Sequence, residues 1–327
     1  MPRTLIEPPE QRSVRKPKLN TLLHSNNVQG NQEGQSALLE AFLPDRLRRD
    51  NLDWSVVVWM AAMHAGCLVA PFFFSWQALV AAVLLHWLTA SIGICLCYHR
   101  YFSHKSLRLV KPAEFFALLC GVVSGEGPPL TWAAVHRMHH QLSDKKGDPH
   151  SPLDGKWWSH MAWLFTKRSS QQQEMLFRRY APELAAQPLM RLMERTYGWW
   201  LVTTGVLLLT LGGLLIGGWY GAVSMLLWAM CVRMVFAYHS TWLVNSATHL
   251  WGYQNYDTRD QSRNLWWVAL LAYGEGWHNN HHAHPSLAPA GHRWWEIDMT
   301  WWTIKALRFF RLAYDVKDEI PSRTSGS

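Results

Sequence analysis

Charged residues and paired cysteines are scarce in this chain of 327 residues. Only 17% of its residues are charged and 49% are hydrophobic, whereas ordinary soluble domains are about 25% charged. The five cysteines lie in apolar stretches without CxxC spacing, which argues against a thiolate zinc site or a disulfide framework and predicts buried free thiols. They are Cys67, Cys95, Cys97, Cys120 and Cys231. The chain starts with a long polar region, so no cleavable signal peptide is expected.

Two long stretches contain no Lys, Arg, Asp or Glu, and they define the expected membrane topology. These are residues 54–98 and 199–232. The first can hold two segments of the roughly 20 residues that cross a bilayer, and the second can do so when its apolar run is continued past Arg233 to residue 242. In both cases a very short connection joins the two segments. We therefore predict an all-α integral membrane protein with four transmembrane helices in two hairpins. The expected spans are residues 54–74, 76–98, 199–216 and 219–242.

Positive charge predicts the orientation of these spans. Thirty of the 31 Lys and Arg residues lie in the N-terminal region, in residues 99–198 or after the fourth span. Two hairpins bring these segments to one side, which the positive-inside rule makes cytoplasmic. We expect residues 99–198 and 243–320 to form a cytoplasmic helical cap, with both termini on the same side. The remaining cation, Arg233, lies inside the fourth span and either snorkels to the interface or contacts the cap.

Composition divides the chain into three expected parts. Residues 1–50 are predicted to be a disordered or amphipathic cytoplasmic region, because the first part is rich in Pro, Gln, Asn and charge. Residues 51–320 form the main membrane-bound domain, and residues 321–327 a flexible tail. The apolar stretch Pro112–Gly125 is too short to span a bilayer and is predicted to be a buried or interfacial helix.

Nine of the seventeen histidines fall in four short patterns close to the predicted cytoplasmic ends of the spans. The patterns read "HRYFSH", "HRMHH", "NSATH" and "HNNHH". On a helix, positions i, i+3 and i+4 share a face, so each HxxHH pattern can direct three imidazoles the same way. Five residues leave the two rings of HxxxxH about 140° apart on an ideal helix. His104 must therefore lie beyond the end of its helix, or that helix must unwind locally.

Four histidine patterns on one side of a membrane predict a metal site. Imidazole suits iron, zinc and copper. Nine ligands are too many for one ion, so we expect two ions with five and four ligands and a water completing the second. The expected ligands are His99, His104, His136, His139, His140, His249, His278, His281 and His282. Of the other histidines, His24 lies in the predicted disordered region, and no metal role is expected for His64, His86 and His239 in the apolar spans. His150, His160, His284 and His292 are candidates for orienting the ligands.

The histidine patterns and the segments around them resemble the membrane fatty acyl desaturases, the family with three histidine boxes. The resemblance runs from "LHWLTASIGICLCYHRYFSH" to "GHRWWEIDMTW". It includes "DPHSP", "WWSHMAWLF", "TWLVNSATHLWG" and "GEGWHNNHH". The chain is most similar to the delta-9 branch, and within it to bacterial and plant members rather than animal ones.

The resemblance implies a ligand set and a reaction. One iron would be held by His99, His104, His136, His140 and His281. The other would be held by His139, His249, His278 and His282, with Asn245 hydrogen-bonding its water. The implied enzyme uses O2 to introduce a cis double bond, of the delta-9 type, into a saturated acyl chain. Its electrons would come from a ferredoxin or a cytochrome b5-type donor, and no nucleic-acid partner is expected.

The substrate is expected to lie in a narrow, bent, apolar tunnel that runs from the metal pair towards the spans. Trp132, Trp163 and Trp242 are candidate lining residues, although tryptophans more often anchor a protein at the membrane interface. Lys167 and Arg168 match a basic pair that contacts the substrate headgroup in the family, and a solvated surface pair is the alternative. Ala134 and Val135 stand where animal acyl-CoA members carry an Arg-Asp pair. Both an acyl group esterified in lipid and an acyl-CoA therefore stay open.

Three other functions compete with desaturation. Fatty acyl or alkane hydroxylases use similar boxes and a similar oxidant. A divalent-metal transporter would place its ligands near the bilayer midplane, whereas these patterns lie outside the predicted spans. A catalytically inactive acyl-binding protein would not need all nine histidines.

Overall fold

The computed structural model describes residues 47–320, which belong to one compact unit, Leu43–Ser327. This part is mostly helical and contains one small antiparallel sheet. The predictions for residues 1–46 and 321–327 lie outside the described residues.

Three helical stretches are long and apolar enough to cross a membrane. The first, Trp54–Phe73, consists of α2 (Trp54–Val69) and η2 (Ala70–Phe73). The second, Trp76–Ser103, consists of α3 (Trp76–His86) and the π-helix η3 (Trp87–Ser103). Ser75 separates the two stretches because its hydroxyl accepts a hydrogen bond from the backbone N–H of Ala78 and so caps α3.

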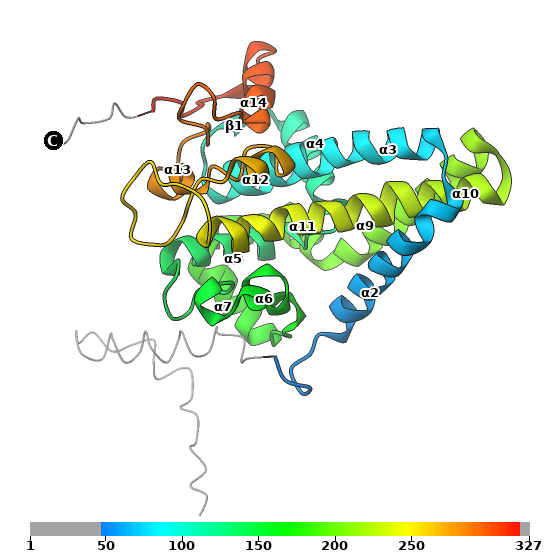
Figure 1. The fold of residues 1–327 in the computed structure, drawn as a ribbon, viewed down its shortest axis with the longest axis horizontal. Coiled ribbons are helices and arrows are strands. Elements are labelled where there is room, and N and C mark those ends of the chain that lie inside the picture. Colours follow the sequence, from blue (N-terminus) through cyan, green and yellow to red (C-terminus); the bar gives the residue numbers. More distant parts are fainter. Residues whose placement is uncertain (1–46, 321–327) are drawn as a thin grey trace, which may run out of the picture. The chain divides into compact units, whose positions relative to one another are not determined.

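The third stretch, Pro188–His249, is 62 residues long and holds the segments predicted as two separate spans. Its elements are α9 (Pro188–Gly212), η6 (Gly213–Gly217), α10 (Gly218–Leu226), η7 (Leu227–Val232), α11 (Arg233–Ser246) and η8 (Ala247–His249). The chain reverses at Gly217 and Gly218, whose φ angles are 110° and 59° and therefore favour glycine. A Cβ at Gly212 would lie 2.3 Å from the carbonyl oxygen of Gly221, so small residues also allow α9 and α10 to pack closely side by side (Figure 1).

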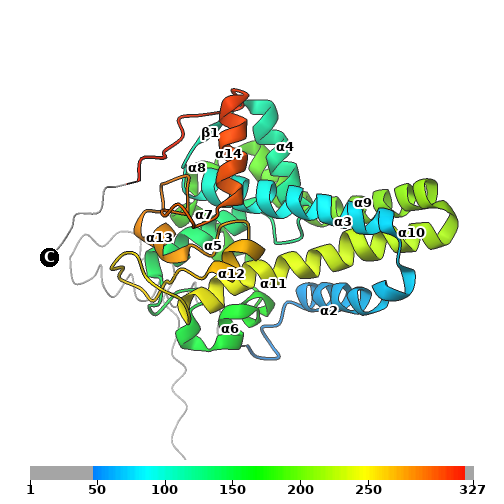
Figure 2. The ribbon, with the colours of Figure 1, turned by 45° about the horizontal axis from the view of Figure 1, so that its top comes forward.

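The remaining elements are short. They are α4 (Lys111–Val122), α5 (Pro129–Leu142), η4 (Pro152–Asp154), α6 (Lys156–His160), η5 (Ala162–Phe165), α7 (Ser170–Tyr180), α8 (Pro182–Ala185), α12 (Trp266–Leu271), α13 (His278–Ala283) and α14 (Met299–Phe309), with β1 (Arg108–Leu109) paired to β2 (Ala313–Tyr314). Helix α4 is the short apolar helix predicted for Pro112–Gly125, and one side of it is buried. Helices α5, α6 and α13 lie at the end of this unit opposite the α9–α10 turn (Figures 1 and 2).

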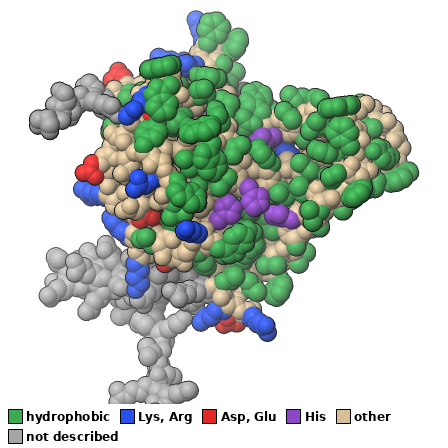
Figure 3. Space-filling model, in the orientation of Figure 1, with side chains coloured by type: hydrophobic (Ala, Val, Ile, Leu, Met, Phe, Trp, Pro, Cys, Tyr) green, Lys and Arg blue, Asp and Glu red, His purple; other side chains and the backbone are tan. Residues whose placement is uncertain are grey.

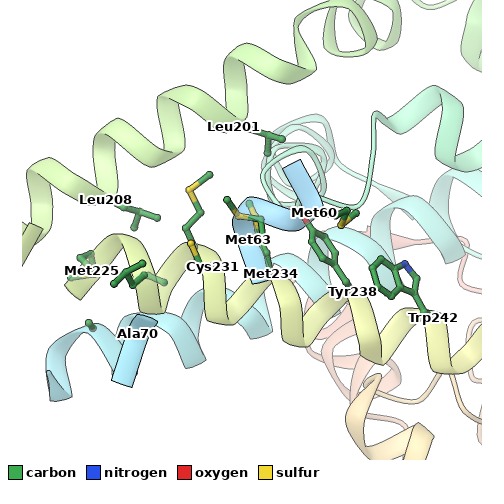
Figure 4. Close-up of a cluster of buried hydrophobic side chains, with 14 of the residues drawn as sticks. Met60, Met63, Ala70, Leu201, Leu208, Met225, Cys231, Met234, Tyr238 and Trp242 are labelled. Carbon is green, nitrogen blue, oxygen red and sulfur yellow. The ribbon is translucent and has the colours of Figure 1, made fainter. Parts of the chain in front are cut away.

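Methionine-rich packing joins α2 to the α9–α11 hairpin. Met60 and Met63 of α2 are buried in one cluster with Met225, Met230 and Met234, and Met63 lies beside Met234 and Cys231 (Figure 4). Many outward side chains of the long helices stay exposed, and hydrophobic residues dominate the α9–α10 end of the face in Figure 3. Apolar surface of this extent is typical of contact with lipid.

Arg233 contacts the rest of the protein instead of snorkelling. Its guanidinium is 3% exposed and donates to the hydroxyl of Thr89 at 2.9 Å and to the carbonyl oxygen of Val123 at 3.1 Å. A third bond goes to the carbonyl of Ala229. The cation therefore ties α11 to the loop after α4. The cysteines are free, as predicted, and all but the partly buried Cys67 are buried.

Candidate metal centre

A π-helix resolves the awkward spacing of "HRYFSH". Helix η3 ends at Ser103, and the backbone N–H of the following His104 donates to the carbonyl of His99, five residues earlier, at 3.1 Å. This i to i+5 pattern widens the turn, so residues five apart return to nearly the same face. The two rings lie 4.8 Å apart between centroids. The sequence offered two explanations, and the structure combines them, with a locally widened helix and His104 just beyond its end.

Each HxxHH pattern contributes to two separate groups. At 100° per residue, i+4 lies about 40° to one side of i and i+3 about 60° to the other. On α5, His136 and His140 accordingly belong to one group and His139 to the other. On α13, His281 joins the first group while its neighbours join the second. One helical turn thus serves two adjacent sites.

Nine histidines form two groups in which the candidate ligand atoms all lie within 4.8 Å of one another. The five-histidine group contains His99, His104, His136, His140 and His281. The four-histidine group contains His139, His249, His278 and His282. These are the same two sets that the family resemblance implies.

The distances between Nε2 atoms suit coordination of shared ions. They are 3.0 Å from His99 to His281, 2.9 Å from His281 to His140, and 3.0 Å from His249 to His278. Two imidazole nitrogens bound at about 2.1 Å and a right angle to one ion would be about 3 Å apart. The Nε2 atoms of His139 and His282 are buried without a hydrogen-bond partner. Buried polar atoms rarely stay unsatisfied, so these nitrogens fit a bound metal.

Four carboxylates hold the outer nitrogens of the ligand rings. The Nδ1–H groups donate from His99 to Glu275 at 2.6 Å, from His139 to Asp148 at 2.9 Å, from His249 to Asp144 at 2.9 Å and from His282 to Asp260 at 2.7 Å. Such bonds fix the ring orientation, direct the Nε2 lone pair inward and increase its basicity. None of these acids was predicted from the sequence, although two lie within the quoted strings "DPHSP" and "GEGWHNNHH".

Burial and carboxylates act in opposite directions on the ligand pKa values. Burial and neighbouring histidines lower the pKa of His136, His140 and His281 well below the usual range, so these rings are neutral. Burial also lowers the pKa of His139, but the carboxylate of Asp148 outweighs it and the net shift is upward. His139 therefore holds a proton more readily than His136, His140 or His281 when no metal is bound.

A buried ion network holds the acid beside His99 in place. Arg100 is 2% exposed and donates to Glu275 at 2.9 Å and to Asp298 at 2.9 Å. Burial opposes ionisation of Glu275, but the charges of His99 and Arg100 prevail and lower the pKa of its carboxyl to about 2. The carboxylate therefore stays charged next to the first histidine of the five-histidine group.

The other histidines lie outside both groups. His150 stacks 4.2 Å from His139, and its backbone N–H donates to Asp148. His64, His239 and His160 form a hydrogen-bonded chain, with nitrogen separations of 3.2 and 3.0 Å, that ends at the hydroxyl of Ser246. Among the remaining histidines within residues 47–320, only His150 contacts both a ring of these groups and its carboxylate.

An apolar cavity of about 840 Å³ leads to the histidines. It is lined by four of the predicted substrate residues, Trp132, Trp163, Arg168 and Trp242, and by Asn245. The fifth predicted residue, Lys167, is exposed and does not line this cavity.

A smaller cavity of about 50 Å³ continues from the large one towards η3 and α12. The two cavities share Trp132, His136, Thr241 and Asn245. Sequence reasoning missed Glu126, which lines the large cavity and accepts a hydrogen bond from Thr241 at 2.8 Å. Burial raises the pKa of this carboxyl to about 7.

Residues 74–316 match the family model described as fatty acid desaturase. The chain belongs to the fatty acid desaturase family. The desaturase is 43% identical over 282 residues to an sn-2 palmitoyl-lipid 9-desaturase of Nostoc sp. (strain 36), an alignment that covers 86% of this chain and 96% of that protein. It is also 42% identical over 271 residues to a chloroplastic palmitoyl-monogalactosyldiacylglycerol delta-7 desaturase of Arabidopsis thaliana, covering 81% and 69% of the two chains.

Similarity also extends to relatives named for a different carrier. The desaturase is 39% identical over 266 residues to an acyl-CoA 5-desaturase of Anemone leveillei, covering 81% of this chain and 79% of the relative. The family and its histidine centre make the desaturase a metal-binding oxidoreductase of lipid metabolism. The regiochemistry and carriers of these relatives differ from one another.

Proposed function

We propose that the protein is an acyl-lipid 9-desaturase with a histidine-ligated diiron centre. The observation that carries this proposal is the position of two imidazole groups at the junction of a large and a small cavity. A saturated acyl chain threaded from the large cavity into the small one would pass directly beside both groups. The 9-desaturase relatives support the position of the double bond.

The proposed topology has four crossings in two hairpins, formed by α2 with α3–η3 and by the two arms of the 62-residue stretch. Both termini and the histidine centre would face the cytoplasm. The uncharged stretches and the exposed apolar surface of these helices support this arrangement. We also propose that residues 51–320 are the desaturase domain, between an N-terminal region of residues 1–50 and a tail of residues 321–327.

The protein's own residues would position the methylene pair. Trp132 stacks on His136 with 5.1 Å between ring centroids, and Thr241 is tied to Glu126 on the other side of the junction. These bulky and tethered side chains would bend the acyl chain at the shared residues and prevent it from sliding. Asn245, which lines both cavities, would hold the water of the four-histidine group.

The irons would be held by the two histidine groups with Nε2 inward. When bound, they would supply the oxidant that removes two hydrogens from an unactivated chain. The reaction balances when O2 receives two electrons and two protons from the acyl chain, as two hydrogen atoms, and two further electrons and two protons from outside. The product of O2 is then two water molecules. The electrons would come from a ferredoxin or a cytochrome b5-type protein.

The lipid-linked substrate follows from the cavity mouth and from the relatives. Ala134 and Val135 are buried and offer no charged group to a coenzyme A. Arg168 lines the large cavity and forms no ion pair with another described residue, so one cation is available for a lipid headgroup. Arg191, in contrast, is neutralised by Glu174 at 2.8 Å.

The decisive experiment is expression in a host without desaturases, followed by gas chromatography of its fatty acids. We expect a new cis-9 alkene, and separation of lipid classes should place it in the membrane lipids before the acyl-CoA pool. An alcohol instead of an alkene would identify a hydroxylase of the same superfamily. Divalent-metal flux without any new fatty acid would identify a transporter.

A further inference from the structure

A second cavity also reaches the metal centre, and it shares no lining residue with the acyl cavity. It measures about 480 Å³ and lies between the C-terminal ends of α5 and α13 and residues 256–260. Its lining includes His140 of the five-histidine group and His282 of the four-histidine group, and neither lines the acyl cavity. The ends of α5 and α13 lie away from the α9–α10 turn (Figure 1). This cavity therefore opens on the part of the unit farthest from the proposed lipid layer.

Two of the three histidines that line this cavity, His140 and His282, connect the two groups. The rings of His140 and His282 are nearly parallel, at 28°, with 4.5 Å between centroids. An electron that reaches either ring is next to both proposed irons. The acyl cavity cannot serve the same purpose, because the substrate chain fills it during the reaction.

Around the second cavity, two acidic side chains point towards the histidines, whereas two basic side chains are exposed to solvent. The acids Asp144 and Asp260 point inward and accept hydrogen bonds from ligand histidines. The cations Lys145 and Arg259 are exposed on the cavity rim and form no ion pair with another described residue. Asp257 is the one exposed acid on this rim. The outward charge is positive, which favours a negatively charged partner.

We propose that this rim is the docking site of an acidic one-electron carrier protein, and that its electrons enter through His140 and His282. The proposal rests on the proposed function. Two reduced carriers are oxidised in each cycle, and each gives up one electron. These two electrons and two protons from water complete the reduction of O2 to two waters, while the acyl chain supplies the other two electrons and its two hydrogens.

Charge reversal at the rim tests the docking site. The full-length protein in lipid nanodiscs is compared with a Lys145→Glu/Arg259→Glu variant, using a reduced plant-type [2Fe–2S] ferredoxin as the probe. We expect the Kd for ferredoxin to rise about tenfold or more at low ionic strength, with a flatter salt dependence. Stopped-flow reoxidation of the ferredoxin should slow in parallel, while iron content and thermal unfolding stay unchanged.

A matched control separates this site from a general charge effect. The Arg49→Glu/Arg311→Glu variant carries the same change in net charge at two exposed residues that do not line the cavity. It should bind ferredoxin with nearly the wild-type Kd. An equal loss in both variants, or no loss in either, would overturn the proposal.

Zero-length carbodiimide cross-linking gives a second measurement that needs no variant. It joins lysine amines to carboxylates of the bound carrier, and mass spectrometry should find Lys145 among the joined residues. Cross-links confined to lysines away from the rim would contradict the docking site. The soluble haem domain of cytochrome b5 serves as the alternative probe, and loss of its binding in the rim variant supports the same surface.

Failure of the proposed function is detected separately. Wild-type protein is reduced chemically, without any carrier, and exposed to O2 with its lipid substrate. Formation of an alkene supports the desaturase reaction independently of docking. If no alkene forms, the proposed function fails and the docking proposal fails with it, whatever the ferredoxin measurements give.

Discussion

The two histidine groups solve the same binding problem in different ways. In the five-histidine group, a carboxylate holds the outer nitrogen of one ring, through the contact of Glu275 with His99. In the four-histidine group, three of the four rings donate to a carboxylate. The group with fewer ligands thus has more of its rings oriented by acids.

The difference suggests that ligand number and ligand orientation compensate for each other. An imidazole that donates to a carboxylate loses less rotational freedom on binding and is a stronger donor to the metal. The five-histidine group achieves the same result by number, and burial lowers the pKa of four of its rings so far that they stay neutral. These are His104, His136, His140 and His281. We therefore expect the four-histidine group to depend on its acids and the five-histidine group to depend little on its single acid.

Loss of a ligand from the smaller group should have the largest effect. His139→Ala leaves three imidazoles in a group whose fourth position is already proposed to be water. We expect the iron content to fall by about half and the alkene to vanish from fatty-acid profiles. A variant that keeps both irons and still makes unsaturated chains would contradict the ligand assignment.

Removal of one acid from each group tests the comparison directly. Asp148→Asn should lower the iron affinity of the four-histidine group by roughly 10–100-fold. This is the usual effect of losing a hydrogen-bond partner of a ligating histidine. Glu275→Gln should weaken iron by less than about tenfold, because four other rings of its group remain unchanged. Competition with a graded series of iron chelators measures both. Equal losses would mean that the acids do not distinguish the groups.

Glu275→Gln needs a stability control, because the same carboxylate pairs with buried Arg100. Asp298 still accepts from Arg100 in that variant, so part of the network remains. Thermal unfolding of the metal-free protein should show the cost of the weakened pair, separately from iron affinity. Asp148→Asn should change metal-free unfolding as well, and both affinities are compared only after this correction.

Sequence reasoning predicted the nine histidines that the structure brings together, but not the acids that hold them. Nine histidines in four patterns could be recognised because ligand spacing is written within single helical turns, as in His136 and His140. The acid partners are different, because Asp144 contacts His249 from 105 residues away and Asp260 contacts His282 from 22 residues away. Their meeting depends on tertiary folding, which no local pattern encodes.

Local geometry explains the remaining differences. The sequence predicted charge-free hairpins, and the apolar stretches confirm long helices there, but the π-helical turns were not foreseen. Helix propensities do not distinguish an i to i+5 bond from an i to i+4 bond, and the widened η3 was required to bring His99 and His104 together. Arg233 was left open for a similar reason, since its partner Val123 lies in a distant loop.

Acidic pH should lower the metal affinity of the four-histidine group more than that of the five-histidine group. This effect is expected to be smaller than that of the substitutions. Asp148 raises the pKa of His139, so in mildly acidic solution a metal must displace a proton from this ring. Each pH unit below that pKa lowers the metal affinity of the four-histidine group by up to about tenfold. His136, His140 and His281 have strongly lowered pKa values and hold no proton in this range. As pH falls, we therefore expect iron to leave the four-histidine group first.

Chelator-driven iron release, followed at pH 7.5, 6.5 and 5.5, measures this order. The fast phase should speed up on acidification, while the slow phase stays nearly constant. In Asp148→Asn the fast phase should be faster at every pH but less dependent on pH, because the charge that raises the pKa of His139 is gone. Release of both irons at the same rate at each pH would show that the acids orient the rings without affecting their proton affinity. The two groups would then differ only in how many of their rings are oriented by acids.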